Sequence, residues 1–284
     1  MYPVLGDTGI EMYGLLGDVG IYFFYVFNLF FIRKKKDLLS NVSLFISGKF
    51  AQTKRFRFLA NPYIYAFLEI VLISYLQFGF LLGDLHNGLG GLVKTGSNYF
   101  GTALFKPIIL FVIFYLLAIN PFRQMDLITP AYPIALVFVK LACFCHGCCS
   151  GFRCEWGFYN VTKDVYDFPV QLVEAGLALI IFIFLMWYKK RAKEGTLFPI
   201  YLIIYSATRF FSEFTRVETN VLGPFKIYHF LCIAGVIVGV AELIIVLKYS
   251  EQIKKLYERN IFVLIKESID KKNKKNKKNN KKRK

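Results

Sequence analysis

The sequence predicts an all-α polytopic membrane protein with seven transmembrane helices, an N-terminus outside and a C-terminus in the cytoplasm. Three observations predict this class. Apolar residues make up 56% of the 284 residues, whereas soluble domains are about 45–50% apolar. Seven apolar runs are long enough to cross a bilayer, which takes roughly 17–25 residues. The basic residues between these runs follow the pattern that the positive-inside rule predicts.

The seven expected spans follow one another with no linker or internal repeat, so we expect one membrane domain. We place this domain at residues 1–250, and a basic, partly disordered cytoplasmic tail at residues 251–284. The expected spans are residues 13–32, 63–83, 101–119, 127–144, 170–188, 197–214 and 228–247.

The charges between the spans predict the orientation. The first expected internal loop carries eight Lys and Arg between Arg33 and Arg57, and the third carries four between Lys189 and Lys193. From Lys271 onward the chain adds ten Lys and Arg and no acidic residue. Such a block is usually solvated, so we interpret it as a tail that fixes the orientation; contact with anionic lipid or nucleic acid is the alternative.

Ionisable residues inside the expected spans are the first candidates for function, because charge is expensive in a bilayer. Arg209 and Glu213 lie four residues apart on one helix face, with Arg216 one turn further on. They form either a structural ion pair at the outer interface or an anion site, since a guanidinium suits phosphate. Lys140 and Glu174 are expected at a similar depth, and this convergence favours a site.

Four stretches carry motifs that occur in order along the chain: "GDTGIEMYGLLGDVG", "MDLITPAYPIALVFVKLACF", "FPVQLVEA" and "LIIYSATRFFSEFTR". The residues that match are Tyr13, Gly14 and Leu15; Asp126, Pro130 and Pro133; Pro169, Gln171, Leu172 and Glu174; Tyr205, Arg209, Phe210, Glu213, Phe214 and Arg216. As an ordered set covering all but the basic tail, they resemble the prolipoprotein diacylglyceryl transferase family.

This resemblance implies an enzyme of the bacterial cytoplasmic membrane, passing through it several times. It would transfer the diacylglyceryl group of phosphatidylglycerol to the lipobox cysteine thiol of a prolipoprotein, the first step of lipoprotein maturation. A thioether forms and glycerol 1-phosphate leaves. The implied partners are phosphatidylglycerol, the prolipoprotein signal peptide and the bilayer, with no nucleic acid and no cofactor.

The resemblance also implies site residues. The residues expected to be catalytic are Arg209, Glu213, His146 and Tyr13. Those expected to bind phosphatidylglycerol are Lys140, Arg209, Cys143, Gln171 and Glu174. His146 has two interpretations, a hydrogen-bond partner of the lipid head group or the base that activates the thiol, because its pKa suits proton transfer near neutrality.

The chain departs from the family at several motif positions. Lys140, Cys143, His146 and Cys148 stand where the family signature has Arg, Asn, Asn and Glu, and Thr95 and Phe168 stand where it has His. A Lys keeps the charge but loses the bidentate fork of Arg. These departures leave a second function open, a non-catalytic or altered-substrate paralogue that binds lipid in the membrane.

Five of the six cysteines fall between residues 143 and 154, and four interpretations stay open. Zinc could take ligands from Cys143, Cys145, His146, Cys148, Cys149 and Cys154, among which Cys145 and Cys148 have the spacing of a ligand pair. A disulfide outside the cytoplasm would join Cys148 or Cys149 to Cys154. The cysteines also fit a substrate-orienting role, or simple packing. Because no second Cys-x-x-Cys pair lies downstream, we predict no metal.

Overall fold

The computed structural model describes residues 12–34, 121–161, 163–217 and 222–258. The second and third expected spans, Thr95 and most of the expected tail lie outside these ranges. Everything below concerns the described part of the chain.

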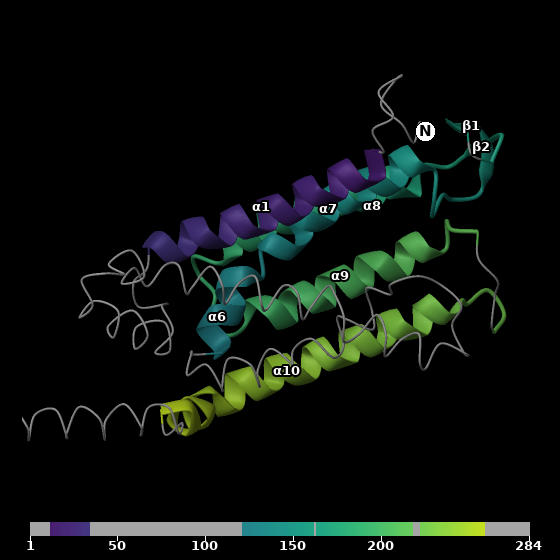
Figure 1. Ribbon diagram of the computed structural model, residues 1–284. Helices are drawn as coiled ribbons and strands as arrows, with labels where there is room; N and C mark the ends of the chain where they lie inside the picture. The colour runs from purple at the N-terminus through teal and green to yellow at the C-terminus, as the bar shows by residue number, and fades with distance from the viewer. Residues whose placement is uncertain (1–11, 35–120, 162, 218–221, 259–284) are drawn as a thin grey trace, which may run out of the picture.

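Helices dominate the described residues, and the long ones lie side by side with their axes roughly aligned (Figure 1). They are α1 (Met12–Lys34), α6 (Pro121–Ile128), α7 (Ala131–His146), α8 (Val170–Tyr188), α9 (Leu197–Glu213) and α10 (Ile227–Glu258). Three described segments are both long and apolar enough to cross a membrane: Met125–His146, Val170–Tyr188 and Ile227–Gln252. Helices α1 and α9 coincide with the first and sixth expected spans. The count of seven spans and the orientation of the termini stay predictions.

The fourth expected span is divided into two helices, α6 and α7. Pro130 separates them because it has no N–H for a continuous helix, whereas Pro133 lies in the first turn of α7, where a missing N–H does no harm. The backbone N–H and the hydroxyl of Thr129 both donate to the Met125 carbonyl, at 3.0 and 2.6 Å. These bonds close the end of α6.

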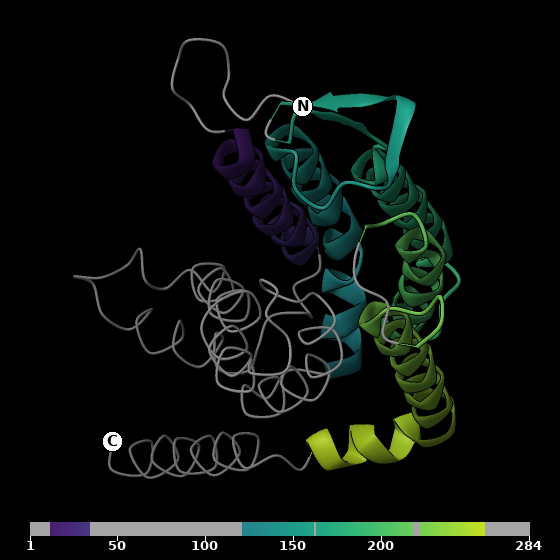
Figure 2. The ribbon, with the colours of Figure 1, turned by 90° about the vertical axis from the view of Figure 1, so that its right-hand side faces the viewer.

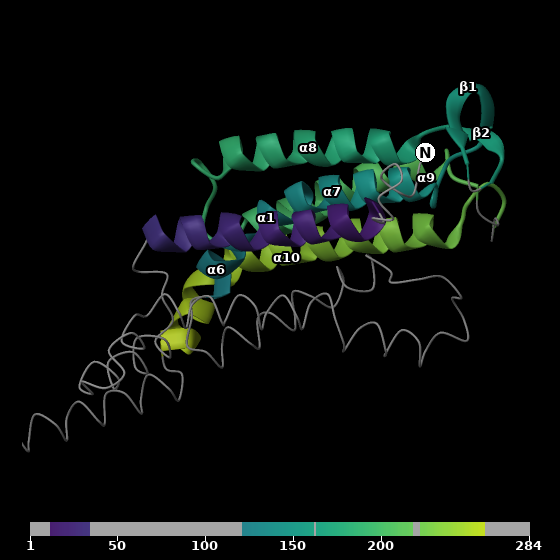
Figure 3. The ribbon, with the colours of Figure 1, turned by 45° about the horizontal axis from the view of Figure 1, so that its top comes forward.

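The expectation of an all-α chain is wrong between α7 and α8. There β1 (Arg153–Asn160) and β2 (Val165–Asp167) form an antiparallel two-stranded sheet, which lies beyond the helix ends (Figure 3). Aromatic and β-branched residues, which favour strands, are frequent in both, and the rings of Tyr159 and Tyr166 lie 5.3 Å apart across them. A connection that leaves the helices must pair its backbone groups elsewhere, and the hairpin pairs them. The fold is mostly helical with one small sheet.

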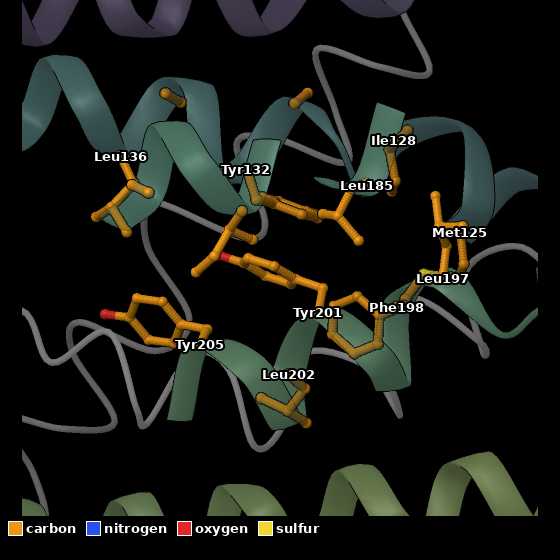
Figure 4. Close-up of a cluster of buried hydrophobic side chains, with 14 of the residues drawn as sticks. Met125, Ile128, Tyr132, Leu136, Leu185, Leu197, Phe198, Tyr201, Leu202 and Tyr205 are labelled. Carbon is orange, nitrogen blue, oxygen red and sulfur yellow. The ribbon is translucent and has the colours of Figure 1, made fainter. Parts of the chain in front are cut away.

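A core of aromatic and aliphatic side chains fixes α7, α8 and α9 against one another (Figure 4). The rings of Tyr132 on α7 and Tyr201 on α9 are stacked, with centroids 6.1 Å apart and planes at 17°. Leu185 of α8 is fully buried in the same cluster. Between helices in a bilayer, close van der Waals packing replaces removal from water as the force that holds them together, so this interdigitated core fixes the relative positions of the three helices.

The helix neighbours decide which residues meet at each end of the bundle. Helix α7 packs along α1 and α8, and α9 packs along α8 and α10; Figure 2 shows α1 against α7 and the last turns of α10 bending aside. At one end, Asp126 accepts hydrogen bonds from the backbone N–H groups of Gly195 (2.6 Å) and Leu197 (3.0 Å), which caps the start of α9. At the other end, near the hairpin, the end of α7, the start of α8 and the end of α9 come together (Figure 1).

Candidate functional site

Glu174, in the second turn of α8, is the centre of a buried group of charges. Its carboxylate accepts hydrogen bonds from Arg209 of α9 and, at 2.7 Å, from Nη2 of Arg216. Nζ of Lys140 on α7 lies 2.7 Å from Glu174 Oε2, and the Ser212 hydroxyl donates to Oε1 at 3.0 Å. The Glu174 side chain is 6% exposed. Three cations therefore compensate a carboxylate that burial alone would strongly destabilise.

A second carboxylate, Glu213, extends this group along α9. It is fully buried; its Oε2 lies 2.5 Å from Nη2 of Arg209 and 3.8 Å from Nε of Arg216. Its Oε1 has no hydrogen-bond partner among the described residues. Nζ of Lys226 donates to the backbone carbonyls of Glu213 and Arg216, at 2.6 and 2.5 Å.

We call these residues the charged cluster: Lys140, Glu174, Arg209, Glu213, Arg216 and Lys226. Within it the cations outnumber the carboxylates. Although burial opposes the charge of Arg216, the neighbouring Glu174 carboxylate raises the pKa of the Arg216 guanidinium above its ordinary value. The cluster therefore keeps an excess of positive charge, which is what an anionic group requires of its binding site.

A small recess of about 10 Å³, partly open to its surroundings, lies against the charged cluster. One part of its lining is polar: Lys140, Glu174, Thr208, Arg209 and Ser212. The rest is apolar: Leu136, Leu177, Ala178, Ile181 and Tyr205. A lining that combines cations with apolar side chains suits an amphiphilic anion.

Three thiols lie together where α7 ends. The Sγ atoms of Cys143, Cys148 and Cys149, which we call the thiol group, are all within 4.8 Å of one another. Cys143 follows Lys140 by three residues on α7, so the thiol group and the charged cluster occupy neighbouring positions on one helix face.

The turn after α7 brings the later two thiols back towards the first. Gly147 adopts φ +77°, and its N–H donates to the carbonyls of Cys143 (3.0 Å) and Phe144 (3.2 Å). This left-handed cap favours glycine, and a Cβ at position 147 would lie 2.4 Å from Oδ1 of Asn160. The Asn160 amide in turn donates to the Gly147 carbonyl at 2.8 Å.

Residues 147–152, which we call the cysteine turn, are also held from α8 and from the residues that follow α9. The Gln171 amide donates to the Cys148 carbonyl at 2.6 Å, and the N–H of Phe152 donates to the Thr215 carbonyl at 2.9 Å. Cys149 has φ +57°, a left-handed conformation that is strained for a non-glycine residue and persists only where neighbours enforce it. The turn is thus held in place rather than loosely packed.

The pKa of the Cys149 thiol lies well below its ordinary value. The main cause is hydrogen bonding from the thiols of Cys143 and Cys148 to the Cys149 thiolate; burial opposes ionisation, while the charges of Arg216 and Lys140 favour it. One sulfur of the thiol group is therefore easily ionised.

The structure brings some of the expected site residues together and places others elsewhere. Lys140, Arg209 and Glu174 meet in the recess, with Glu213 behind Arg209. His146 does not line this recess; its ring packs edge-on against Tyr13, with centroids 5.4 Å apart. The Tyr13 side chain is 46% exposed.

Two expected lipid-binding residues shape the cysteine turn instead of lining the recess. Gln171 is fully buried under that turn, and Cys143 belongs to the thiol group. All six cysteines are free thiols, so the disulfide to Cys154 is not formed. Cys145, the first residue of the expected zinc pair, lies outside the thiol group.

Sequence reasoning gave too little weight to Arg216, Ser212, Cys149 and Lys226. Arg216 follows Glu213 by three residues, a helical spacing that was enough to assign it to the same face. Lys226 lies in the connection before α10, and no spacing rule connects it to α9. His229, also buried, accepts a hydrogen bond from the Lys226 N–H at 3.0 Å and lies among three Phe rings, so its role is structural.

Comparisons with known proteins agree with the motifs. A sequence model described as "Prolipoprotein diacylglyceryl transferase" matches residues 3–245. A protein of Clostridium tetani named "Phosphatidylglycerol--prolipoprotein diacylglyceryl transferase" is 30% identical over 102 residues, which are 33% of this chain and 41% of that relative.

Two further proteins with the same name match over longer stretches. The one from Lactococcus lactis strain IL1403 is 28% identical over 160 residues, 52% of this chain and 61% of the relative. The one from Bordetella bronchiseptica is 26% identical over 240 residues, 77% of this chain and 82% of the relative. The match to the Clostridium relative thus spans about two fifths of that protein's length.

Proposed function

The chain belongs to the prolipoprotein diacylglyceryl transferase family, and on this premise we propose that it transfers a diacylglyceryl group from phosphatidylglycerol to the lipobox cysteine of a prolipoprotein, as a multi-pass enzyme of the bacterial cytoplasmic membrane. One observation carries the proposal: a small recess whose lining combines the cations Lys140 and Arg209 with apolar side chains. A phospholipid likewise combines a phosphate head group with acyl chains.

The reaction makes two demands on the site. The acceptor thiol must lose its proton, because the thiolate is the nucleophile. Its sulfur then attacks the glyceryl carbon that carries the phosphate ester, so that a C–S bond forms while the C–O bond breaks. The leaving group is glycerol 1-phosphate, and cations must stand where its negative charge develops.

The charged cluster meets the second demand, for cations near the leaving group. Arg209 and Lys140 face the recess and would contact the phosphate, while Glu213 holds Arg209 in place from behind. Glu174 fixes both cations and Arg216 before substrate arrives. Cations held in place in this way stabilise developing charge without reorganising during the reaction.

Tyr13 and His146 would act at the same end of the bundle. Their rings are in contact, so the phenol and the imidazole can serve one bound molecule. We assign the Tyr13 hydroxyl to the lipid head group and His146 to acceptance of the thiol proton. Cys143 and Gln171 would support the head-group side through the cysteine turn.

Complementation tests the function directly. In a bacterium depleted of its own diacylglyceryl transferase, the wild-type chain should restore lipid attachment to a reporter lipoprotein, measured by the mass of its N-terminal peptide. Arg209→Ala should lower the lipidated fraction at least 100-fold, as expected when a donor to developing charge is removed. Arg191→Ala is the matched control, because Arg191 is exposed and lies over the Trp187 ring.

Two results would contradict the proposed enzymatic function or the proposed role of Arg209. Failure of a well-expressed wild type to lipidate any reporter, combined with retention of phosphatidylglycerol during purification, would favour the lipid-binding paralogue. Full activity of the Arg209→Ala variant would show that Arg209 does not bind the phosphate.

A further inference from the structure

We propose that Cys143, Cys148 and Cys149 form a site for a soft divalent cation of the zinc class, with one coordination position left open for the thiol of the acceptor. This deepens the proposed function and rests on it only for the identity of the fourth ligand. It also reverses our expectation from the sequence, which predicted no metal because no second Cys-x-x-Cys pair follows Cys145 and Cys148.

The distances suit a metal. Zinc–sulfur bonds of about 2.3 Å place the sulfur atoms of a tetrahedral site about 3.8 Å apart. The three Sγ atoms already lie within 4.8 Å of one another. The sulfur atoms are therefore within about 1 Å of the separation that a tetrahedral zinc site requires.

The turn that carries the thiols is held in advance. Gly147 in its left-handed cap, the strained φ of Cys149 and the hydrogen bond from Gln171 to the Cys148 carbonyl all constrain it. Backbone strain that neighbours maintain is typical of functional sites. Simple packing of small apolar residues does not require Cys149 to adopt a strained, left-handed conformation.

Three thiolates also select the kind of ion. Sulfur ligands favour zinc and other soft ions over magnesium or calcium. Three protein ligands, instead of four, are typical of zinc sites that act on a substrate, because the fourth position stays open. With three thiolates the complex carries one negative charge, and Lys140, one turn earlier on α7, together with Arg216 is placed to compensate it.

The open position connects the metal to the reaction. A thiol that coordinates zinc is deprotonated outright. The lipobox thiol would give up its proton to solvent as it takes the open position, and the site would supply an ionised nucleophile. Its sulfur would then form the C–S bond as the glyceryl C–O bond breaks, with glycerol 1-phosphate leaving towards Arg209 and Lys140. No electron is gained or lost, so the step needs no oxidant or reductant.

Cobalt(II) is the probe, because it occupies zinc sites and gives a visible spectrum. Full-length protein would be purified in detergent under reducing, oxygen-free conditions, stripped with a chelator and titrated with Co²⁺. We expect one equivalent to bind with thiolate-to-cobalt charge-transfer bands, and Zn²⁺ to displace it. Cys143→Ser, Cys148→Ser and Cys149→Ser should each weaken binding at least 10-fold.

Cys154→Ser and Cys145→Ser are the matched controls and should bind as the wild type does. Absence of cobalt binding by well-folded, reduced wild type would overturn the proposal, and so would a disulfide within the thiol group of protein isolated without oxygen. If Cys145→Ser lost cobalt binding and Cys143→Ser kept it, the metal ligands would be the Cys-x-x-Cys pair Cys145 and Cys148 instead.

The fourth position has its own measurement. A lipobox peptide with a free cysteine should shift the cobalt bands, whereas the same peptide with serine should not. If neither peptide changes the spectrum, the open position does not take the acceptor. Because none of these measurements uses lipid transfer, a failure of complementation and a failure of the metal site are distinguishable.

Discussion

At the scale of single residues, Glu174 has the largest influence on the site. It is one carboxylate on α8, yet Lys140 of α7, Arg209 of α9 and Arg216 beyond α9 all contact it. Removing a partner from a buried ion pair leaves the remaining charges uncompensated, which is far more destabilising than the absence of the whole group. Glu174 is thus a structural requirement for the recess as well as a possible contact of the lipid.

Glu174→Gln should therefore destabilise the protein by roughly 3–5 kcal/mol, because it leaves three cations, two of them buried, with one carboxylate fewer. Thermal unfolding of the purified variant in detergent measures this. Glu155→Gln, on the exposed face of β1, is the matched control and should change the stability by less than about 0.5 kcal/mol. Equal stability of the two variants would contradict the central role of Glu174.

At the scale of elements, the end of α7 determines where the thiols lie. The helix has to stop at His146 and reverse within one residue, and only then do Cys148 and Cys149 come back to Cys143. Gly147 permits this reversal through its positive φ, and Asn160 of β1 occupies the space that a side chain at position 147 would need. The hairpin therefore supports the cysteine turn, although it carries none of the thiol group.

Gly147→Ala should lower the free energy of unfolding by about 1–3 kcal/mol, from the strain of a left-handed alanine and from displacement of Asn160. Gly176→Ala is a useful comparison, because a Cβ there meets nothing within 4 Å and alanine suits a helix interior better by about 1 kcal/mol. The two variants should shift the unfolding temperature in opposite directions. A stabilised Gly147→Ala protein would show that the turn is not needed.

At the scale of the whole molecule, the helices present two different ends. One end carries the hairpin, the N-terminal end of α1 and the site; the other carries α6 and the connection between α8 and α9 (Figure 1). The positive-inside rule predicts that the first end faces outward, since Lys189–Lys193 lie at the other end. A site at the outer end would open towards the leaflet from which the lipid and the acceptor peptide arrive.

Epitope tags can test this orientation. A tag inserted after Asp164, in the exposed turn of the hairpin, should bind antibody on intact spheroplasts. A tag after Lys284 should bind only once the membrane is permeabilised. Exposure of both tags on the same side would require a different number of spans, and the reverse pattern would place the site in the cytoplasm.

Much of the fold follows from local sequence. Apolar runs predict helices because each run must satisfy its own backbone groups in lipid, and the bounds of α8 and α9 agree with the expected spans within one residue. The hairpin was missed because two short aromatic strands beyond a helix end have weak periodicity. Pro130 and Gly147 predict the helix break and the left-handed turn only if the position of the helix end is already known.

The sequence by itself determined the helical segments, the family and the residues Arg209, Glu213, Lys140 and Glu174 as candidates, because helical spacing and ordered motifs are local properties. Only the tertiary structure decided that Glu174 joins three cations, that His146 pairs with Tyr13 outside the recess, and that Cys143 groups with Cys148 and Cys149 rather than Cys145 with Cys148. These outcomes depend on how α7, α8 and α9 pack and on one left-handed turn. Contacts between separate helices are fixed by packing in three dimensions, which no spacing along the chain encodes.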